Sequence, residues 1–223
     1  MSPAYSCLES KPDTGVSKPG PGSWASEGWS WYRFEVPIWL TESEYETLKA
    51  ACSRMIPSTR GYPGASEAGV VDYIDNLLGA FSFDPPRIFA GGPTSGRSGG
   101  EARFSEFVAL SGLEELAWRI RIEGSMGIAE REFNGPVVGL QERYREGLRS
   151  LGREFVSLDE KDMDARLAAN EEFTKLLYEH CCEGMYGAPE YGGNRDLLGW
   201  SVIGFDGDVQ PRGWSDEEVS GPS

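Results

Sequence analysis

The stretch EEFTKLLYEHCCEGMY, residues 171–186, carries a strong helical signal. Phe173, Leu176, Leu177 and His180 recur at the three- and four-residue spacing that places side chains on one face of an α-helix. Such a face is stable only when it packs against other elements. We therefore expect a helix from about Glu171 to Tyr186 that buries this face in a mainly α fold.

A second amphipathic helix is expected to begin at Thr41 and to end before Pro57, which cannot continue it. Its first residues, Thr41 to Glu44, fit a capping box, in which the first and fourth residues satisfy each other's backbone N–H groups. The predicted apolar stripe of this helix consists of Tyr45, Leu48, Cys52 and Met55.

Three further helices are predicted by the same spacing, and a fourth by a capping pattern. They are expected over about Ser66–Phe81, over about Leu113–Glu123, and from about Pro136, a good first-turn residue. Ser157 to Glu160 fits another capping box, which opens a short acidic helix. The expected apolar faces are Val70, Ile74, Leu77, Leu78 and Phe81; Leu113, Leu116, Ala117 and Ile120; and Val137, Leu140, Tyr144, Leu148 and Leu151.

The chain outside these helices is rich in glycine and proline, with 29 Gly and 14 Pro in 223 residues. We predict an irregular helical domain over residues 40–206, with long Gly/Pro-rich loops such as residues 84–103. An extended aromatic arm over residues 1–39 precedes it, and an acidic tail over residues 207–223 follows it. Long loops of this kind often serve as partner-binding surface.

The formal net charge of −15 excludes several classes of partner. Such a surface repels phosphate backbones and anionic membranes, so we expect no nucleic-acid partner. No apolar run approaches the roughly 20 residues of a membrane-spanning helix. The first 30 residues show no secretory pattern, and no Arg-Arg pair occurs. A cytoplasmic location is expected, with export only if a partner carries the chain.

Two groups of residues resemble catalytic or metal motifs without the context those motifs need. Residues 96–100, Gly-Arg-Ser-Gly-Gly, fit a nucleophile elbow around Ser98, with His180 as its later histidine, but no strand precedes it. Residues 91–98 approach a phosphate loop in which Arg97 replaces the lysine. A serine hydrolase using Ser98 and His180 stays an alternative, as does a stand-alone binding or scaffold protein. No catalytic, cofactor-binding or metal site is assigned to the chain.

The thiols and the single histidine favour structural roles. Cys7, Cys52, Cys181 and Cys182 do not have the spacing of a disulfide framework, so reduced thiols are expected. His180 is the only histidine, and neighbours on a helix point in directions about 100° apart. It cannot easily share an ion with Cys181 or Cys182, and a packed or hydrogen-bonded imidazole is predicted.

Two segments are candidates for contact with a partner. In residues 191–196, two glycines permit a tight turn or a close backbone approach, and charged side chains can pin the turn. This segment can equally fasten the C-terminal region onto the helices. The candidate residues are Tyr191, Gly192, Gly193, Asn194, Arg195 and Asp196, the aromatics Trp200 and Phe205, and the arm tryptophans Trp24, Trp29, Trp31 and Trp39.

Two blocks of the sequence, roughly residues 40–82 and 140–206, resemble the gluconate 2-dehydrogenase subunit 3 family. The second block carries the more specific match. Its matching residues are Phe173 and Leu177, then Glu183-Gly184-Met185-Tyr186, Pro189-Glu190-Tyr191-Gly192-Gly193-Asn194-Arg195-Asp196, Gly199-Trp200 and Ile203-Gly204-Phe205. The first block contributes Leu40-Thr41, Ile56-Pro57, Glu67-Ala68-Gly69-Val70-Val71 and Ile74-Asp75.

This resemblance implies a small accessory subunit that has no cofactor of its own. Members of the family partner a large FAD-dependent dehydrogenase of the glucose–methanol–choline type, often with a cytochrome c subunit. They are thought to help the large subunit fold and travel. The expected role is therefore binding, stabilisation and assembly of a flavoprotein that oxidises a sugar or similar alcohol.

Overall fold

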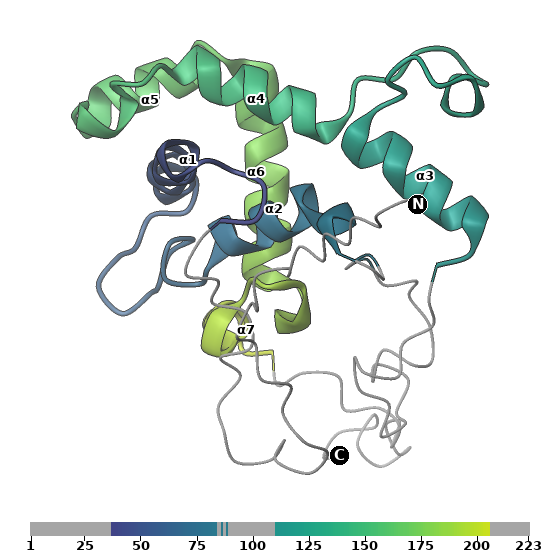
Figure 1. Ribbon diagram of the computed structural model, residues 1–223. Helices are drawn as coiled ribbons and strands as arrows, with labels where there is room; N and C mark the ends of the chain where they lie inside the picture. The colour runs from purple at the N-terminus through teal and green to yellow at the C-terminus, as the bar shows by residue number, and fades with distance from the viewer. Residues whose placement is uncertain (1–36, 84–85, 87, 89–109, 206–223) are drawn as a thin grey trace, which may run out of the picture.

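Helix α6, Glu171–Tyr186, runs through the middle of the structure, a computed structural model that describes residues 37–83, 86, 88 and 110–205 (Figure 1). It packs against α1, α2, α4, α5 and α7. All four residues of its predicted apolar face are buried, and so are Cys181, Gly184 and Met185. Because several helices surround α6, its buried surface is wider than the stripe of a helix that faces only one neighbour.

The described residues form seven α-helices and no β-strand, which confirms the mainly α class. The other helices are α1 Glu42–Met55, α2 Val70–Leu78, α3 Gly112–Glu123, α4 Leu140–Leu151, α5 Glu160–Ala168 and α7 Leu198–Ile203. None of the helices in this part of the chain combines the length and the apolar composition needed to cross a membrane.

Helix α1 begins as its capping pattern predicts. The Thr41 backbone N–H donates to the Glu44 carboxylate at 2.9 Å, and the Glu44 N–H donates to the Thr41 hydroxyl at 3.3 Å. Leu48 and Cys52 are buried from the predicted stripe, and Tyr45 and Met55 pack half-buried at its two ends. The capping box therefore sets both the start of α1 and the face that meets α2 and α6.

The prediction for α2 was too long at both ends. Gly69 has a φ of +71°, so residues 65–69 form a turn and the helix begins at Val70 instead of Ser66. It ends at Leu78, and a short 3₁₀ turn, Ala80–Ser82, replaces the predicted last turn. The buried face remains as expected, with Val70, Ile74 and Leu78 in the core.

The predicted start of α4 at Pro136 was also wrong. Residues 136–139 are not helical, because Val137 pairs through both its N–H and its C=O with Ser125, twelve residues earlier. The helix begins only at Leu140, after Gly139. Val137 is consequently 41% exposed, whereas the other four residues of the expected stripe, Leu140, Tyr144, Leu148 and Leu151, are buried.

Two further local predictions need correction. Helix α5 is capped by Asp159, which accepts from the Asp162 N–H at 2.9 Å, and the Ser157 hydroxyl donates to the Glu154 carbonyl instead of forming a capping box. In α3 the predicted face stays largely open: Leu113 is 78% exposed, and the one buried residue of the helix is Ile122. Helix α3 therefore lies at the periphery, beside α2 and α4 (Figure 1).

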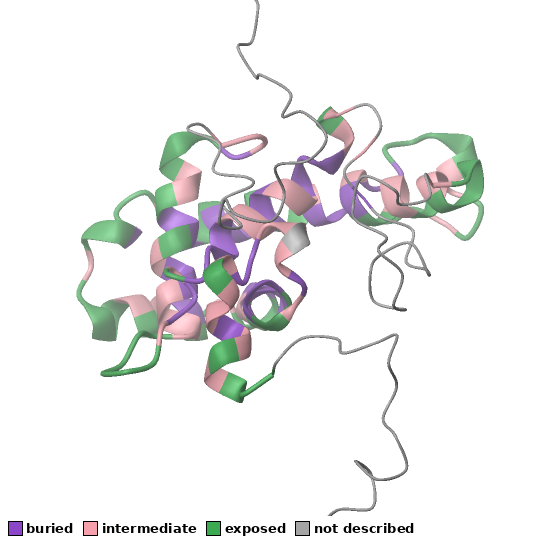
Figure 2. Ribbon diagram, turned by 90° about the horizontal axis from the view of Figure 1, so that it is seen from below, coloured by how far each residue is buried: buried purple, intermediate pink, exposed green. Residues whose placement is uncertain are grey.

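The core lies where α1, α2 and α4 surround α6. Figure 2 shows that the buried residues gather in the interior of the described part of the chain. Two of its members are thiols, Cys52 on α1 and Cys181 on α6, both free and both without exposed surface. Burial raises the pKa of the Cys52 thiol well above its ordinary value, helped by the neighbouring Cys181. These two cysteines are therefore packing residues, with Cys52 in the apolar stripe predicted for its helix, and Cys182 is a half-buried free thiol beside them.

Candidate partner interface

Residues 191–197 form what we call the C-terminal segment. The Asn194 side chain lies at its centre and has no exposed surface. Its Nδ2 donates to the Gly187 carbonyl at 3.0 Å. Its Oδ1 accepts from the backbone N–H groups of Gly199, at 2.9 Å, and Trp200, at 3.3 Å. One amide thus satisfies the end of α6 and the first turn of α7, where four backbone groups at each helix end otherwise lack partners.

The two glycines of this segment serve different geometric needs. Gly192 has a φ of +98°, a conformation that favours glycine, and an added Cβ would meet the Asn76 side chain. Gly193 is buried so close to α6 that an added Cβ would overlap the Gly184 carbonyl oxygen. The next N–H, that of Asn194, donates to this same carbonyl at 2.7 Å. The predicted tight turn and close backbone approach are both present.

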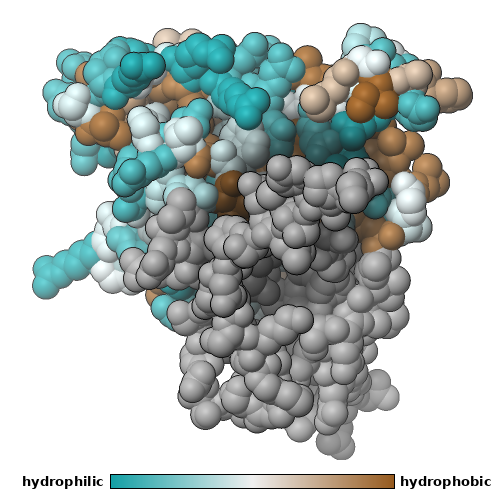
Figure 3. Space-filling view, viewed as in Figure 1, coloured by the Kyte–Doolittle hydropathy of each residue, from teal (hydrophilic) through white to brown (hydrophobic). Residues whose placement is uncertain are grey.

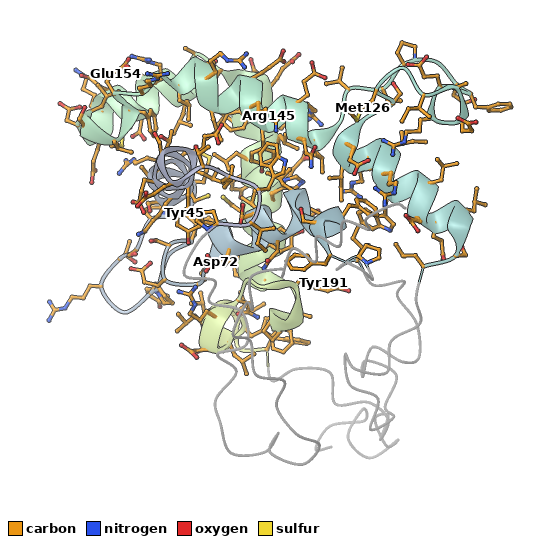
Figure 4. All side chains as sticks on the ribbon, in the orientation of Figure 1. Tyr45, Asp72, Met126, Arg145, Glu154 and Tyr191 are labelled. Atoms are coloured by element: carbon orange, nitrogen blue, oxygen red, sulfur yellow. The ribbon has the colours of Figure 1, made fainter. Side chains whose placement is uncertain are left out.

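Arg195 joins the segment to α1 and α2. Its N–H donates to the Ala68 carbonyl at 2.9 Å, and its guanidinium forms an ion pair with Asp72. Asp72 also accepts from the Tyr45 hydroxyl at 2.6 Å. Burial and this bond to Asp72 raise the pKa of Tyr45, which keeps the phenol neutral. Asp72 therefore connects α1, α2 and the C-terminal segment. Figure 4 shows the positions of Asp72 and Tyr45.

The end of the segment combines backbone strain with exposed apolar side chains. Asp196 and Leu197 have φ angles of +54° and +58°, which are rare for residues other than glycine. Helix α7 follows directly and was not predicted, because six residues are too few for a periodic signal. The Trp200 Nε1–H donates to the Tyr186 carbonyl at 2.8 Å, and its ring packs edge-on against Phe205, which is 42% exposed.

The end of the N-terminal arm is held by Asp75 on α2. The Asp75 carboxylate, almost fully buried, accepts from the N–H groups of Ile38, Trp39 and Leu40 at 2.5, 3.0 and 2.9 Å. The Trp39 ring packs against the core, with the Arg145 guanidinium 4.7 Å from its centroid. The sequence analysis did not identify this site. The only local signal was an acidic residue that shares a helix face with the buried Val71 and Leu78, and the three N–H groups that it binds lie more than 30 residues away.

Several predicted elements lie outside the described residues. They are Trp24, Trp29 and Trp31 of the arm, the acidic tail 207–223 and Ser98 with its surrounding motifs. The interface role assigned to Tyr191, Gly192, Gly193, Asn194, Arg195 and Asp196 stays a prediction. What the geometry adds is that this segment fastens α7 and α6 to α1 and α2.

His180 is a packed core residue, as expected. It is 2% exposed, and its Nδ1 lies 2.8 Å from the Tyr144 hydroxyl, with the two rings stacked. Desolvation lowers the pKa of His180, so the imidazole is neutral near pH 7. A neutral imidazole accepts the Tyr144 hydrogen through Nδ1, which gives the buried phenol its hydrogen-bond partner.

The acidic cluster at α5 is a solvated helix start. Arg54 binds the Asp164 carboxylate at 2.8 Å and Glu160 at 2.9 Å, and the hydrogen bond from Arg54 lowers the pKa of Asp164. In the described part of the chain, no group of three or more His, Cys, Asp or Glu side chains is arranged to hold a metal ion. A pocket of about 290 Å³ beside α5 is lined by Leu158, Asp162, Ala165, Arg166 and Ala169.

Comparison with known proteins agrees with the residues that suggested a family. A family model described as gluconate 2-dehydrogenase subunit 3 matches residues 42–207, well over half of the 223-residue chain. Searches of the curated proteins and of the solved structures found no match. The matched range contains every helix described above and the C-terminal segment around Asn194. The chain therefore belongs to the gluconate 2-dehydrogenase subunit 3 family.

Proposed function

We propose that this chain is a non-catalytic accessory subunit that binds, stabilises and helps to assemble a large dehydrogenase subunit. The partner is an FAD-dependent oxidoreductase of the glucose–methanol–choline type that acts on a sugar or similar alcohol. The observation that carries this proposal is the family match over residues 42–207. A cytochrome c subunit is a further expected member of the complex.

The contacts of the best-matching segment support a structural role over a catalytic one. Asn194 and Gly193 are committed to the ends of α6 and α7, and Arg195 is committed to Asp72. His180 is paired with Tyr144 inside the core. Groups committed in this way shape a surface, and we assign the flavin, the substrate and the hydride transfer to the partner.

The distribution of exposed apolar side chains also favours a partner. Large hydrophobic side chains of this chain that face solvent include Phe133 at 92%, Met126 at 71% and Ile203 at 57% exposure. Burying such groups against another polypeptide is favourable, and a stable heteromeric interface removes about 1,600 Å² of surface from solvent. The partner is expected to supply the surface that covers them.

Co-expression tests this function directly. We expect the large flavoprotein subunit of the same organism to be soluble and yellow when it is made with this chain, and to co-purify with it at fixed stoichiometry. Omitting this chain should lower the yield of FAD-loaded large subunit, measured by flavin absorbance. A chain that remains a colourless monomer in the presence of that flavoprotein, and leaves its yield unchanged, would contradict the proposal.

A further inference from the structure

The connection between α3 and α4, residues Gly124–Gly139, displays an unusual share of the apolar surface. We call it the α3–α4 loop. Of the twelve large hydrophobic residues that are exposed in the described part of the chain, five lie in these sixteen residues. Figure 3 shows hydrophobic side chains gathered at the end of the molecule formed by α3 and this loop. The five are Met126 at 71%, Ile128 at 40%, Phe133 at 92%, Val137 at 41% and Val138 at 58% exposure.

The base of the α3–α4 loop is closed by direct backbone packing. The Ser125 N–H donates to the Val137 carbonyl at 3.0 Å, and the Val137 N–H donates to the Ser125 hydroxyl at 2.9 Å. Gly124 and Gly139 touch backbone to backbone, since a Cβ on Gly124 would lie 2.8 Å from the Gly139 nitrogen. Gly124 also has a φ of +87°, which favours glycine. The two ends of the loop are thereby fixed against each other.

Charged groups hold the loop from inside. Arg131 donates to the Gly124 carbonyl at 3.2 Å and pairs with Glu123 at 2.8 Å, and its side chain is only 11% exposed. Glu123 is itself held by Arg119 at 3.0 Å. The arginine of the loop is therefore used internally, and it does not present a positive charge to a partner.

The apolar side chains stay exposed around this polar framework, and the Met126 Sδ lies 4.0 Å from the Arg131 guanidinium. Met126 follows the buried Ser125 and adopts a φ of +52°, a conformation that costs about 1 kcal/mol or more in a residue with a side chain. In Figure 4, Met126 lies at the end of α3, far from Tyr45, Asp72 and Tyr191. A loop that is ordered before binding loses less conformational entropy when a partner covers it, so its apolar contacts contribute more to affinity.

The charge around these side chains favours one kind of occupant. Glu130 is exposed on the loop, Glu132 is half-buried beside it, and the whole chain carries a net charge of −15. A second copy of this chain would bring like charges together, which opposes association. A face that combines an apolar socket with surrounding lysine or arginine side chains is complementary to the loop.

We propose that the α3–α4 loop docks into an apolar socket rimmed by basic residues on the large dehydrogenase subunit. This inference rests on the proposed function, and it assigns the contact to a segment that the C-terminal motif does not include. Phe133 and Met126 are the anchors, since a few large, fully desolvated side chains usually carry most of the energy of an interface. Glu130 contributes to the rate of association through its charge.

The experiment compares binding of variants to the large flavoprotein subunit of the same organism. The combined variant Phe133→Ser, Met126→Ser should raise the Kd at least about tenfold, since anchor residues have effects of this size. Val156→Ser is the matched control, because Val156 is also apolar and 48% exposed but lies after α4, and it should leave the Kd unchanged. All these side chains are exposed, so thermal unfolding should show that the variants stay folded.

The outcomes separate this inference from the proposed function. If the wild-type chain binds and the combined variant binds equally well, the docking role of the loop is overturned and the accessory function stands. If the wild-type chain does not bind the flavoprotein, the proposed function and this inference fail together. Glu130→Lys should slow association severalfold at low salt and less at high salt; an unchanged rate would overturn the predicted basic rim.

Thiol labelling of the variant Phe133→Cys identifies the occupant. Peptide mapping should show fast modification of position 133 in the chain alone and protection in the complex with the large subunit. Slow modification in the chain alone would mean that another segment of this chain, or a second copy, covers the loop, and that result would overturn the proposal. Sedimentation of the chain alone separates these last two cases.

Discussion

The buried side-chain amide of Asn194 connects the end of α6 to the start of α7. Its side chain serves three backbone groups, the Gly187 carbonyl and the N–H groups of Gly199 and Trp200. Its own backbone is left-handed, with a φ of +44°, which asparagine tolerates better than most residues. A serine or alanine at this position could match neither the reach nor the backbone preference.

The variant Asn194→Ala should be strongly destabilised. It leaves three backbone groups without partners in a buried site, each of which costs about 1–3 kcal/mol. Because neighbouring water and local relaxation recover part of this, we expect a loss of about 2–4 kcal/mol, measured by urea unfolding. Asn134→Ala, at an exposed position of the α3–α4 loop, is the control and should change the midpoint little. Equal midpoints for both variants would contradict this account of Asn194.

His180 makes stability depend on pH. Burial lowers its pKa below the ordinary value of 6.5, so the unfolded chain binds a proton that the folded protein resists. The stabilisation from a neutral His180 is complete above that value and is lost as the pH falls through it towards the folded pKa. We expect the free energy of unfolding to decrease between about pH 7.5 and about pH 5.5.

The chain offers a clean control for this pH effect, because His180 is its only histidine. The variant His180→Gln should be less stable at neutral pH but should show a much smaller slope in the same interval. The carboxylates with lowered pKa values, such as Glu67 and Asp164, act below about pH 4.5 and do not confuse the comparison. A slope that persists unchanged in the glutamine variant would show that other groups cause it.

At the scale of elements, the contact between α6 and the C-terminal segment depends on the absence of side chains. Gly193 approaches the Gly184 carbonyl too closely for any Cβ, and the obstructing atom belongs to the helix backbone. A side chain there must push the segment away from α6 and lengthen the 2.7 Å bond from the Asn194 N–H.

Gly193→Ala should therefore lower the free energy of unfolding by about 2 kcal/mol or more, measured by thermal or urea unfolding. The matched control is Gly112→Ala at the start of α3, where an added Cβ meets nothing within 4 Å. That control should be neutral or slightly stabilising, because alanine loses less backbone entropy than glycine. A Gly193→Ala protein as stable as the control would refute the close packing of the C-terminal segment against α6.

Periodicity predicted the helices whose faces meet the core, and it failed where distant backbone contacts decide. The faces of α1, α4 and α6 were correct, because a stripe at helical spacing reports burial directly. The start of α4 was wrong because Ser125 competes for the backbone of Val137. The start of α2 was wrong because Gly69 turns out of the helix. The contact between Ser125 and Val137 leaves no local pattern, whereas Gly69 is a local turn signal that apolar periodicity alone does not report.

The candidate site was also predicted only in part from the sequence. The turn at Gly192 and the ion pair of Arg195 were predictable from residue type, because glycine and arginine have few alternatives in such a segment. The role of Asp75 was not, since its three donors at residues 38–40 are brought close only by the packing of α1 against α2. Most of the exposed α3–α4 loop lies between two predicted helices, where no periodic pattern indicated burial or exposure, and only Val137 was expected to be buried.

At the scale of the whole molecule, the contacts that hold the helices together and the exposed apolar side chains of the α3–α4 loop fall in different places. The Asn194 segment, Asp72 and Asp75 hold α1, α2, α6 and α7 together. The α3–α4 loop lies away from them, beside α3 (Figure 1). Changes to the exposed side chains of the α3–α4 loop are therefore expected to have little effect on the stability of the core.

The two buried thiols between α1 and α6 allow the rate at which these helices separate to be measured by chemical modification. Cys52 and Cys181 have no exposed surface, so an alkylating reagent modifies them only during rare excursions that separate these helices. The half-buried Cys182, one residue along, reports local fraying of the same helix. Comparing the modification rate of the buried cysteines with that of Cys182 under native conditions would measure how often α6 separates from α1. Repeating the comparison with a bound partner would measure how far binding reduces these opening motions.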